Sequence, residues 1–504
     1  MKNLTITLTV AIATLFAFSS CQKETFENIE PANNIRTITG TFENNSLTKT
    51  TLNSDGKTPE WAVGDVIRVL NAISYQDVTL EASNISDNTI TFTTSLVGAL
   101  YAVYPASVTT MESCGDGNIT FTIPAIQDGT FASANICVAK STEEDENNKD
   151  NLIFSNATAV LKITTADDVV GVDVTATNSI AGTVSASFDG NEVNLTTSAL
   201  DKNYVSAVGS SASSDNIFYF AVAPVETGST VVNCYKTETK GSENKSSKEL
   251  QRNIIYTMDL SSLTIDNSDL TGQRGILNGH EYVVVKCGDK NLKWATKNIG
   301  ADSETDYGYY FFWAGTEAYV HNGSGWEKAD GPGKLSGGFK RANAPYYASA
   351  TYPFYGKYNL SDPKLELESV DDAAQSCLGV DWRMPTSNEF NAMKDATYWA
   401  WDDTDKGCYV YFPNPSTDGG KYKNGEGSYS KSNALLFFPA AGYGYENSFN
   451  NGGDTGYYWS STSGTSDQMN PNPEKAGAVQ ISKTRLYFTF TERQRGCSIR
   501  AVSE

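Results

Sequence analysis

The chain has 504 residues, of which 39% are apolar and 19% are charged, and its formal net charge is −21. This length exceeds what one hydrophobic core can organise, so we expect two to four domains. The acidic excess argues against nucleic acid or anionic lipid surfaces as partners, because both would repel the chain. Beyond residue 20, no apolar run is long enough to span a bilayer.

Residues 1–20 have the organisation of a signal peptide. Lys2 precedes a short, mostly apolar run that ends in Ser19-Ser20-Cys21, as is typical of secretory leaders. This end resembles a bacterial lipobox, which predicts acylation of Cys21 and anchoring in the outer membrane with the rest of the chain exposed at the cell surface. The alternative is an ordinary secretory cleavage in which Cys21 has no role. Residues 21–36 are polar and are predicted to be a lipidated tether.

Residues 37–150 and 151–265 are each predicted to form a β-sandwich, so the fold class is mainly β. Both segments alternate apolar and polar residues with the period of half-buried strands, as at 118–123. We expect a hairpin over 184–195, because Gly190 at its centre tolerates positive φ. The charged run 141–150 cannot bury itself and marks the boundary between the sandwiches.

Four stretches in this part carry a family resemblance, namely 50–57, 61–69, 100–105 and 218–224. They resemble fimbrillin-like (Mfa-like) lipoproteins, and Trp61 is expected to be a core residue. The resemblance implies a pilus-subunit precursor, in which cleavage after an arginine removes a strand and the exposed groove accepts a donor strand from the next subunit. Arg36 is the candidate cleavage site. The alternatives are that Arg36 has no role and that the lipoprotein does not polymerise.

The composition changes near residue 275, beyond which lie seven of the eight Trp and twenty of the twenty-seven Tyr. We therefore place a linker at 266–275 and a third domain, of α+β type, at 276–504. Its first strand is expected at 281–287. A helix is predicted over 370–377, with Ser369 as its N-cap.

The stretch 381–390, DWRMPTSNEF, has a local structural explanation. Thr386 and Glu389 have the spacing of a capping box, in which each side chain binds the backbone amide of the other residue. Arg383 lies beside a core residue, Trp382, and is expected to form a structural ion pair. These residues are therefore predicted to shape the backbone rather than to perform chemistry.

Five stretches of the third domain together resemble the Fibrobacter succinogenes major paralogous (FISUMP) domain: 294–298, 382–389, 437–443, 456–462 and 495–502. This resemblance implies a loop-rich, C-type-lectin-like fold whose first and last strands pair, related to formylglycine-generating enzymes. Those enzymes bind copper through a closely spaced cysteine pair near the C-terminus, where this chain has only Cys497. The chain has two histidines, His280 and His321. We therefore predict no catalytic residues, no cofactor and no metal.

Seven cysteines follow Cys21, and none has the C-x-x-C spacing of zinc or redox sites. Strand alternation turns Cys497 inward together with Ile499, and directs Arg500 outward. Cys287 is inward by the same reasoning, and Cys377 falls on the apolar face of the predicted helix. A disulfide of Cys497 with either Cys287 or Cys377 is one interpretation, and buried free thiols are the other.

Binding is the function that remains. The segments 319–357 and 402–431 are rich in Gly, Tyr and Asn and are predicted to be surface loops that carry recognition. Candidate ligand-binding residues are Asn470, Asn472 and Glu474, which resemble the Pro-flanked calcium motif of C-type lectins. Trp313 and Trp459 are assigned to the core.

These observations favour a non-enzymatic surface lipoprotein that adheres to a glycan or to a surface protein through its third domain. A place at the tip of a fimbrium is expected, because no segment follows the last predicted strand, 498–502, that could be donated. The alternatives are a surface lipoprotein that captures glycans without polymerising and, third, a glycan hydrolase.

Overall fold

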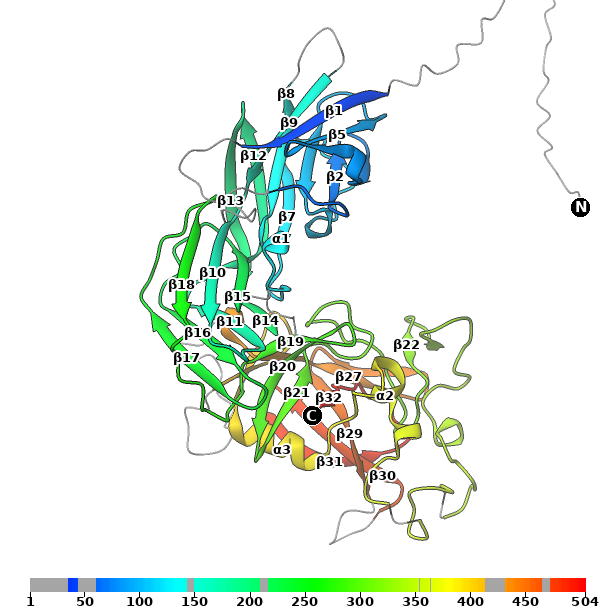
Figure 1. The fold of residues 1–504 in the computed structure, drawn as a ribbon. Helices are drawn as coiled ribbons and strands as arrows, with labels where there is room; N and C mark the ends of the chain where they lie inside the picture. The colour runs from blue at the N-terminus through cyan, green and yellow to red at the C-terminus, as the bar shows by residue number, and fades with distance from the viewer. Residues whose placement is uncertain are drawn as a thin grey trace, which may run out of the picture.

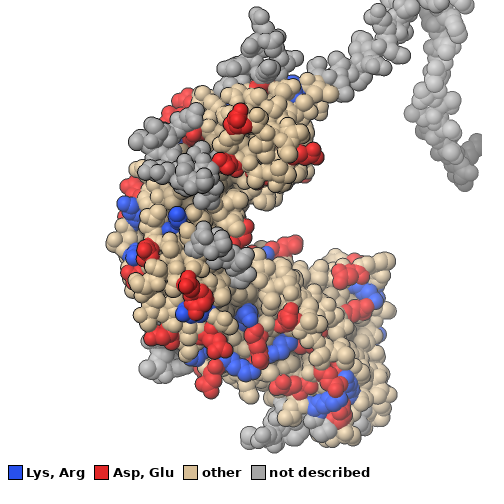
Figure 2. Space-filling view, in the orientation of Figure 1, with Lys and Arg blue, Asp and Glu red and all other residues tan. Residues whose placement is uncertain are grey.

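The computed structural model describes residues 35–43, 60–142, 149–208, 216–352, 354–362, 364–412, 431–464 and 472–504. The described chain is mainly β, as predicted. It follows an arc, with the first strands at one end and the C-terminal domain at the other (Figure 1). An open bay lies on the inner side of this arc (Figure 2). The predicted signal peptide, Cys21 and the stretch 50–57 lie outside the described residues.

The first part of the chain contains β1 (Arg36–Phe42), β2 (Val66–Leu70), β3 (Tyr75–Thr79), η1 (Ala82–Asn84), β4 (Ile85–Ser86), β5 (Thr89–Thr94), β6 (Tyr101–Tyr104), η2 (Ala106–Val108), β7 (Ile119–Ile123), α1 (Phe131–Ala134), β8 (Cys137–Thr142) and β9 (Lys149–Asn156). Eight of the strands form one sheet in the order β3-β2-β6-β8-β9-β1-β5-β4. Within it, β1 pairs antiparallel with β5 and parallel with β9.

This sheet closes around a core of its own. Ile38 of β1, Val69 of β2 and Phe154 of β9 are fully buried in one hydrophobic cluster, although they come from both halves of the sheet. Trp61 belongs to the same cluster, as predicted, and its ring stacks on Phe42 with a centroid distance of 4.3 Å. The alternating strands thus bury their apolar faces against each other.

The second part contains β10 (Ala159–Thr165), β11 (Gly171–Ala176), β12 (Ala181–Asp189), β13 (Glu192–Lys202), β14 (Tyr204–Val208), β15 (Ile217–Val222), β16 (Thr230–Tyr235), β17 (Lys240–Lys245) and β18 (Ile255–Leu260). A three-stranded sheet, β15-β10-β18, and a four-stranded sheet, β14-β11-β16-β17, form the second sandwich. The predicted hairpin is confirmed, since Asp189 pairs with Glu192 and Gly190 has a φ of +60°.

The two sandwiches share strands and core. β7 pairs with β12, so a strand of the first part extends a sheet of the second. One hydrophobic cluster contains Val103 and Phe121 from the first part together with Val184 and Phe220 from the second. The sheet of the first part also continues through β9 to Asn156, past the expected boundary at residue 150.

The C-terminal domain contains β19 (Arg274–Leu277), β20 (His280–Cys287), β21 (Lys290–Ala295), β22 (Tyr319–His321), β23 (Trp326–Lys328), η3 (Arg341–Asn343), η4 (Ser369–Asp371), α2 (Ala373–Leu378), α3 (Ser387–Ala396), β24 (Tyr398–Asp402), β25 (Gly407–Tyr411), η5 (Lys431–Asn433), β26 (Leu436–Pro439), β27 (Ala441–Tyr445), β28 (Ser448–Gly452), β29 (Thr455–Ser463), β30 (Lys475–Ser482), β31 (Arg485–Glu492) and β32 (Val502–Ser503). Its two larger sheets have the orders β19-β20-β21-β32 and β28-β27-β29-β30-β31. The last strand therefore pairs with β21, near the first strands of the domain.

The predicted helix at 370–377 is wrong at its start. Residues Ser369–Asp371 form the 3₁₀ turn η4, and α2 begins only at Ala373. The reason is the side chain of Asp372, which accepts hydrogen bonds from the amides of Ala374 and Gln375 and so occupies the N-cap itself. Val370 consequently lies outside the helix and is exposed.

The final segment is buried on both faces, which corrects the predicted outward position of Arg500. Its guanidinium is fully buried and donates to the carbonyls of Thr296 (2.6 Å) and Phe437 (2.8 Å) and to the side chain of Asn298 (3.0 Å). Burial lowers the pKa of Arg500 to about 10. The side chain therefore ties together three separate stretches of the domain.

The second half of the expected linker 266–275 is mostly buried at the junction of the second sandwich and the C-terminal domain, whereas residues 266–268 are exposed. Arg274 is buried, lies 4.0 Å over the ring of Tyr204 and donates to the carbonyl of Ala434 at 2.8 Å. Lys202 pairs with Glu304 across the same junction at 3.2 Å. These contacts connect the second sandwich directly to the third domain.

Candidate ligand-binding site

A hollow of about 370 Å³ opens on the loop side of the C-terminal domain. Its walls come from three stretches that are distant in sequence: 312–319, 343–346 and 370–371. Phe312 and Tyr319 are buried and belong to a local hydrophobic cluster, whereas Tyr346 and Val370 are exposed. A rigid aromatic base thus supports an accessible rim.

The ring of Tyr346 is held at this rim by a buried carboxylate. The Tyr346 hydroxyl donates to Asp371, which is 4% exposed. Asp371 also accepts from the hydroxyl of Tyr358 and from the ammonium of Lys357, both at 2.5 Å. Three donors therefore satisfy one buried carboxylate, and their geometry fixes the direction of the exposed ring.

The charges in this network are matched. Burial alone would lower the pKa of Lys357, but its hydrogen bonds to Asp371 and Glu368 outweigh that effect and raise the pKa. Burial raises the pKa of Tyr358, so its hydroxyl stays protonated at neutral pH. Lys357 thus balances the charge of Asp371 beneath the hollow.

A second carboxylate, that of Glu317, also lines the hollow. Glu317 accepts hydrogen bonds from Lys328 and Tyr319, which hold its pKa below the usual value. Asn343 is also fixed, since its amide nitrogen donates to the carbonyls of Ser336 and Gly338, both at 2.8 Å. The hollow is therefore lined by an exposed aromatic ring and by oriented carboxylate and amide groups, a combination that can stack on a sugar face and bind its hydroxyls.

Of the three ligand residues predicted from the sequence, the two that are described do not line the hollow. Asn470 is outside the described residues. The Asn472 side chain accepts from the Glu474 amide at 2.9 Å, and Glu474 pairs with Arg341, also at 2.9 Å. The carboxylate of Glu474 is thus engaged in an ion pair, and neither residue lines the hollow. In the described part of the chain, no group of three or more His, Cys, Asp or Glu residues is placed to hold a metal ion.

Of the two interpretations of the cysteines, the structure agrees with the one that has no disulfide. The seven cysteines from Cys114 to Cys497, all within the described residues, form no disulfide. Cys287 and Cys497 are buried in different hydrophobic clusters, which keeps them apart. Cys377 is exposed rather than on a buried helix face, because α2 is short and buries only Ala373 and Ala374.

The local structure predicted for the DWRMPTSNEF stretch is confirmed. Thr386 and Glu389 form a complete capping box at the start of α3. Both terminal nitrogens of Arg383 donate to the Glu389 carboxylate, at 2.6 and 2.8 Å, and Trp382 is fully buried. Trp313 and Trp459 are also core residues. The pair of Arg383 and Glu389 therefore fixes a helix terminus, away from the hollow.

The sequence predicted one of the loops that form the hollow, but it did not predict which residues line it. The predicted loop 319–357 does contain Asn343 and Tyr346. However, Trp326, Phe339 and Tyr355 of the same loop are buried in their own cluster, so aromatic content alone could not separate contact residues from core. No local signal pointed to Asp371, whose placement depends on η4.

His280 and His321 are half-buried and stand apart from the hollow. The ring of His280 contacts Trp382, and the Nε2 atom of His321 lies 3.2 Å from the carbonyl of Asn447. Among the described residues, no helix is long and apolar enough to cross a membrane.

The comparison with known proteins found similar proteins among solved structures. No protein-family model matches the chain, and no curated protein matches it. A candidate cell adhesion protein of Bacteroides ovatus aligns at 15% identity over 46% of this chain and 95% of its own, with a TM-score of 0.30. A fimbrial protein of the same species aligns at 11% identity over 93% and 98%, with a TM-score of 0.24.

The fimbrial anchor protein Mfa2 of Porphyromonas gingivalis aligns at 11% identity over 39% of this chain and 77% of its own, with a TM-score of 0.20. At these TM-scores the alignments do not establish a shared fold or function.

Proposed function

We propose that the chain is a lipid-anchored, fimbria-associated surface adhesin that binds a glycan at the hollow of its C-terminal domain. The observation that carries the proposal is the ring of Tyr346, which is 39% exposed yet held by a buried carboxylate. An exposed aromatic side chain normally rotates freely, and it loses this rotational entropy when a ligand stacks on it. Fixing it beside oriented polar groups lowers the entropy lost when a planar sugar face stacks on it.

The arrangement along the chain supports this proposal. The proposed anchor, Cys21, precedes β1 at one end of the arc, and the C-terminal domain lies at the other end (Figure 1). Arg274 contacts Tyr204 of the second sandwich and Ala434 of the C-terminal domain, and these contacts hold the two parts together. The hollow would then belong to the domain that lies farther along the arc from the proposed anchor, where an adhesive surface meets its ligand.

The test is a glycan array probed with the soluble chain beginning at residue 22, followed by calorimetry on the strongest ligand. Tyr346→Ala should weaken binding at least tenfold, because stacking on an aromatic ring is lost. Tyr352→Ala is the matched control, since Tyr352 is also exposed and aromatic but does not line the hollow. Equal losses in the two variants, or none in Tyr346→Ala, would reject the site.

A second candidate function is a capture lipoprotein that does not polymerise. The observation that favours it is the position of β1, which begins at Arg36 and pairs on both sides. Cleavage after Arg36 would leave β1 attached to the domain, so within the described residues it would open no groove for a donor strand. Treatment with an arginine-specific protease decides between the two: polymers of a fragment that begins at Thr37 favour the fimbrial subunit.

A further inference from the structure

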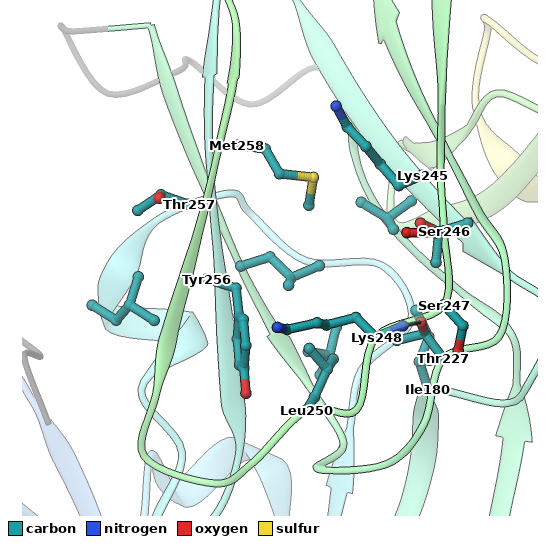
Figure 3. A pocket seen from close by; sticks show the side chains of 15 residues that line it. Ile180, Thr227, Lys245, Ser246, Ser247, Lys248, Leu250, Tyr256, Thr257 and Met258 are labelled. Carbon is teal, nitrogen blue, oxygen red and sulfur yellow. Dashed lines mark hydrogen bonds between the residues drawn. The ribbon is translucent and has the colours of Figure 1, made fainter. Parts of the chain in front are cut away.

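A cavity of about 480 Å³ lies within the second sandwich, where the edge strands β17 and β18 leave the two sheets apart (Figure 3). Its floor is apolar and buried, and consists of Leu161, Val174, Ile180, Val222 and Leu250. The volume falls within the range of about 300–1,000 Å³ found for small-molecule sites. Such a floor is suited to a hydrocarbon and offers nothing to a sugar hydroxyl.

The walls of the cavity differ in character. Tyr256 and Met258 project from β18 on one side, and Ser246, Ser247 and Lys248 lie on the other (Figure 3). Met258 is unbranched and polarizable, so it can adapt to a flexible chain. One wall is therefore apolar and the other is polar.

Two charged residues, Lys245 and Lys248, line the cavity. The backbone of Lys248 is fixed by two hydrogen bonds with Thr227, at 3.0 and 3.1 Å. Its ammonium lies 5.8 Å from the ring centroid of Tyr256, across the cavity. Lys245 nearby pairs with Glu243, whereas no ion pair of Lys248 is present among the described residues. In a chain of net charge −21, an unpaired cation above an apolar cavity complements an anion.

We propose that this cavity binds a straight-chain carboxylic acid, with the hydrocarbon against the floor and the carboxylate at Lys248. The site is separate from the glycan hollow and does not depend on the adhesin proposal. One cation without an ion-pair partner above an apolar floor matches one chain with one anionic end. A strand of a partner chain would present alternating side chains and many backbone groups instead.

The experiment is calorimetric titration of the soluble chain beginning at residue 22 with saturated carboxylates of 6 to 16 carbons at pH 8. Affinity should rise about fourfold per methylene until the floor is filled, and then level off. Dodecanol should bind about tenfold more weakly than dodecanoate, because it lacks the charge. Lys248→Gln should remove this preference for the acid while leaving the affinity for dodecanol unchanged.

Lys236→Gln is the matched control, because Lys236 pairs with Asp168 in the same sandwich and lies outside the cavity. Thermal unfolding with and without dodecanoate checks that each variant is folded. Failure of the wild-type chain to bind any member of the series at 1 mM would overturn the proposal. So would equal affinity for acid and alcohol, or light scattering showing a dimer that Lys248→Gln disrupts and dodecanoate does not.

Discussion

The Nη2 atom of Arg36 lies 2.5 Å from the Oδ2 atom of Asp150, and both side chains are largely buried. Arg36 also donates to the carbonyl of Gly98 at 2.7 Å. Arg36, the candidate cleavage site, is thus the first residue of a central strand, and its side chain forms hydrogen bonds with two neighbouring segments. A protease can reach this bond only when the beginning of β1 separates locally from its neighbouring segments.

Asp150→Asn should therefore accelerate cleavage after Arg36 by about tenfold, because the arginine loses a charge-assisted hydrogen bond. The measurement is digestion by an arginine-specific protease, with N-terminal sequencing of the fragment that begins at Thr37. Asp77→Asn, which removes the ion-pair partner of Arg68, should leave this rate unchanged. Identical rates in Asp150→Asn and in the wild type would contradict a protective role for the pair.

The capping box predicts a pH-dependent contribution to stability. Burial alone would raise the pKa of Glu389, but hydrogen bonds from Arg383 and Thr386 outweigh it and hold the pKa below its usual value. The contribution is therefore present above the pKa of the unfolded chain and is lost as pH falls through the folded pKa. Glu389→Gln should lower the free energy of unfolding by about 1–2 kcal/mol at pH 7, and by much less at pH 3. Urea unfolding at both pH values measures this, with Asp395→Asn at the far end of α3 as the control.

Asp173 should give the free energy of unfolding the opposite pH dependence. It is buried beside Tyr235 and Asn233, both of which donate to it, and burial raises its pKa to about 6 from 3.8. Lys240 and Arg274 are the nearby cations. Because the folded state holds the proton more tightly than the unfolded state, the contribution of Asp173 is fully present below pH 3.8 and is lost as pH rises through 6.

Asp173→Asn should remove this dependence. The variant should gain up to about 3 kcal/mol over the wild type at pH 8 and lose that advantage near pH 4. Urea unfolding between pH 4 and pH 8 measures the difference, and Asp168→Asn, an exposed neighbour, is the control. A wild-type chain whose stability is flat over this range would show that Asp173 is charged throughout.

The absence of disulfides among the described cysteines leads to a direct chemical prediction. In a chain carrying Cys21→Ser, a thiol reagent at pH 8 should label one cysteine of the folded protein, Cys377, and all seven after unfolding without reductant. The reason is that Cys377 is exposed and the other six are buried. Cys377→Ser should abolish labelling of the folded protein, and five titratable thiols instead of seven would reveal a disulfide.

Local chemistry was sufficient for the features that depend on neighbours in sequence. Alternation located strands such as β7 and β12, Gly190 located the hairpin turn, and Thr386 with Glu389 located the start of α3. Each of these is stabilised mainly by contacts within a few residues, so a short stretch contains the information.

Only the tertiary structure decided the rest. The parallel pairing of β1 with β9, the second buried face around Arg500 and the hollow at Tyr346 all join segments that are distant along the chain. Burial of Arg500 and Asp371 contradicts their local preference for water, and each is tolerated because partners from elsewhere satisfy its hydrogen bonds. Such partners follow from how the sheets pack, which no local pattern records.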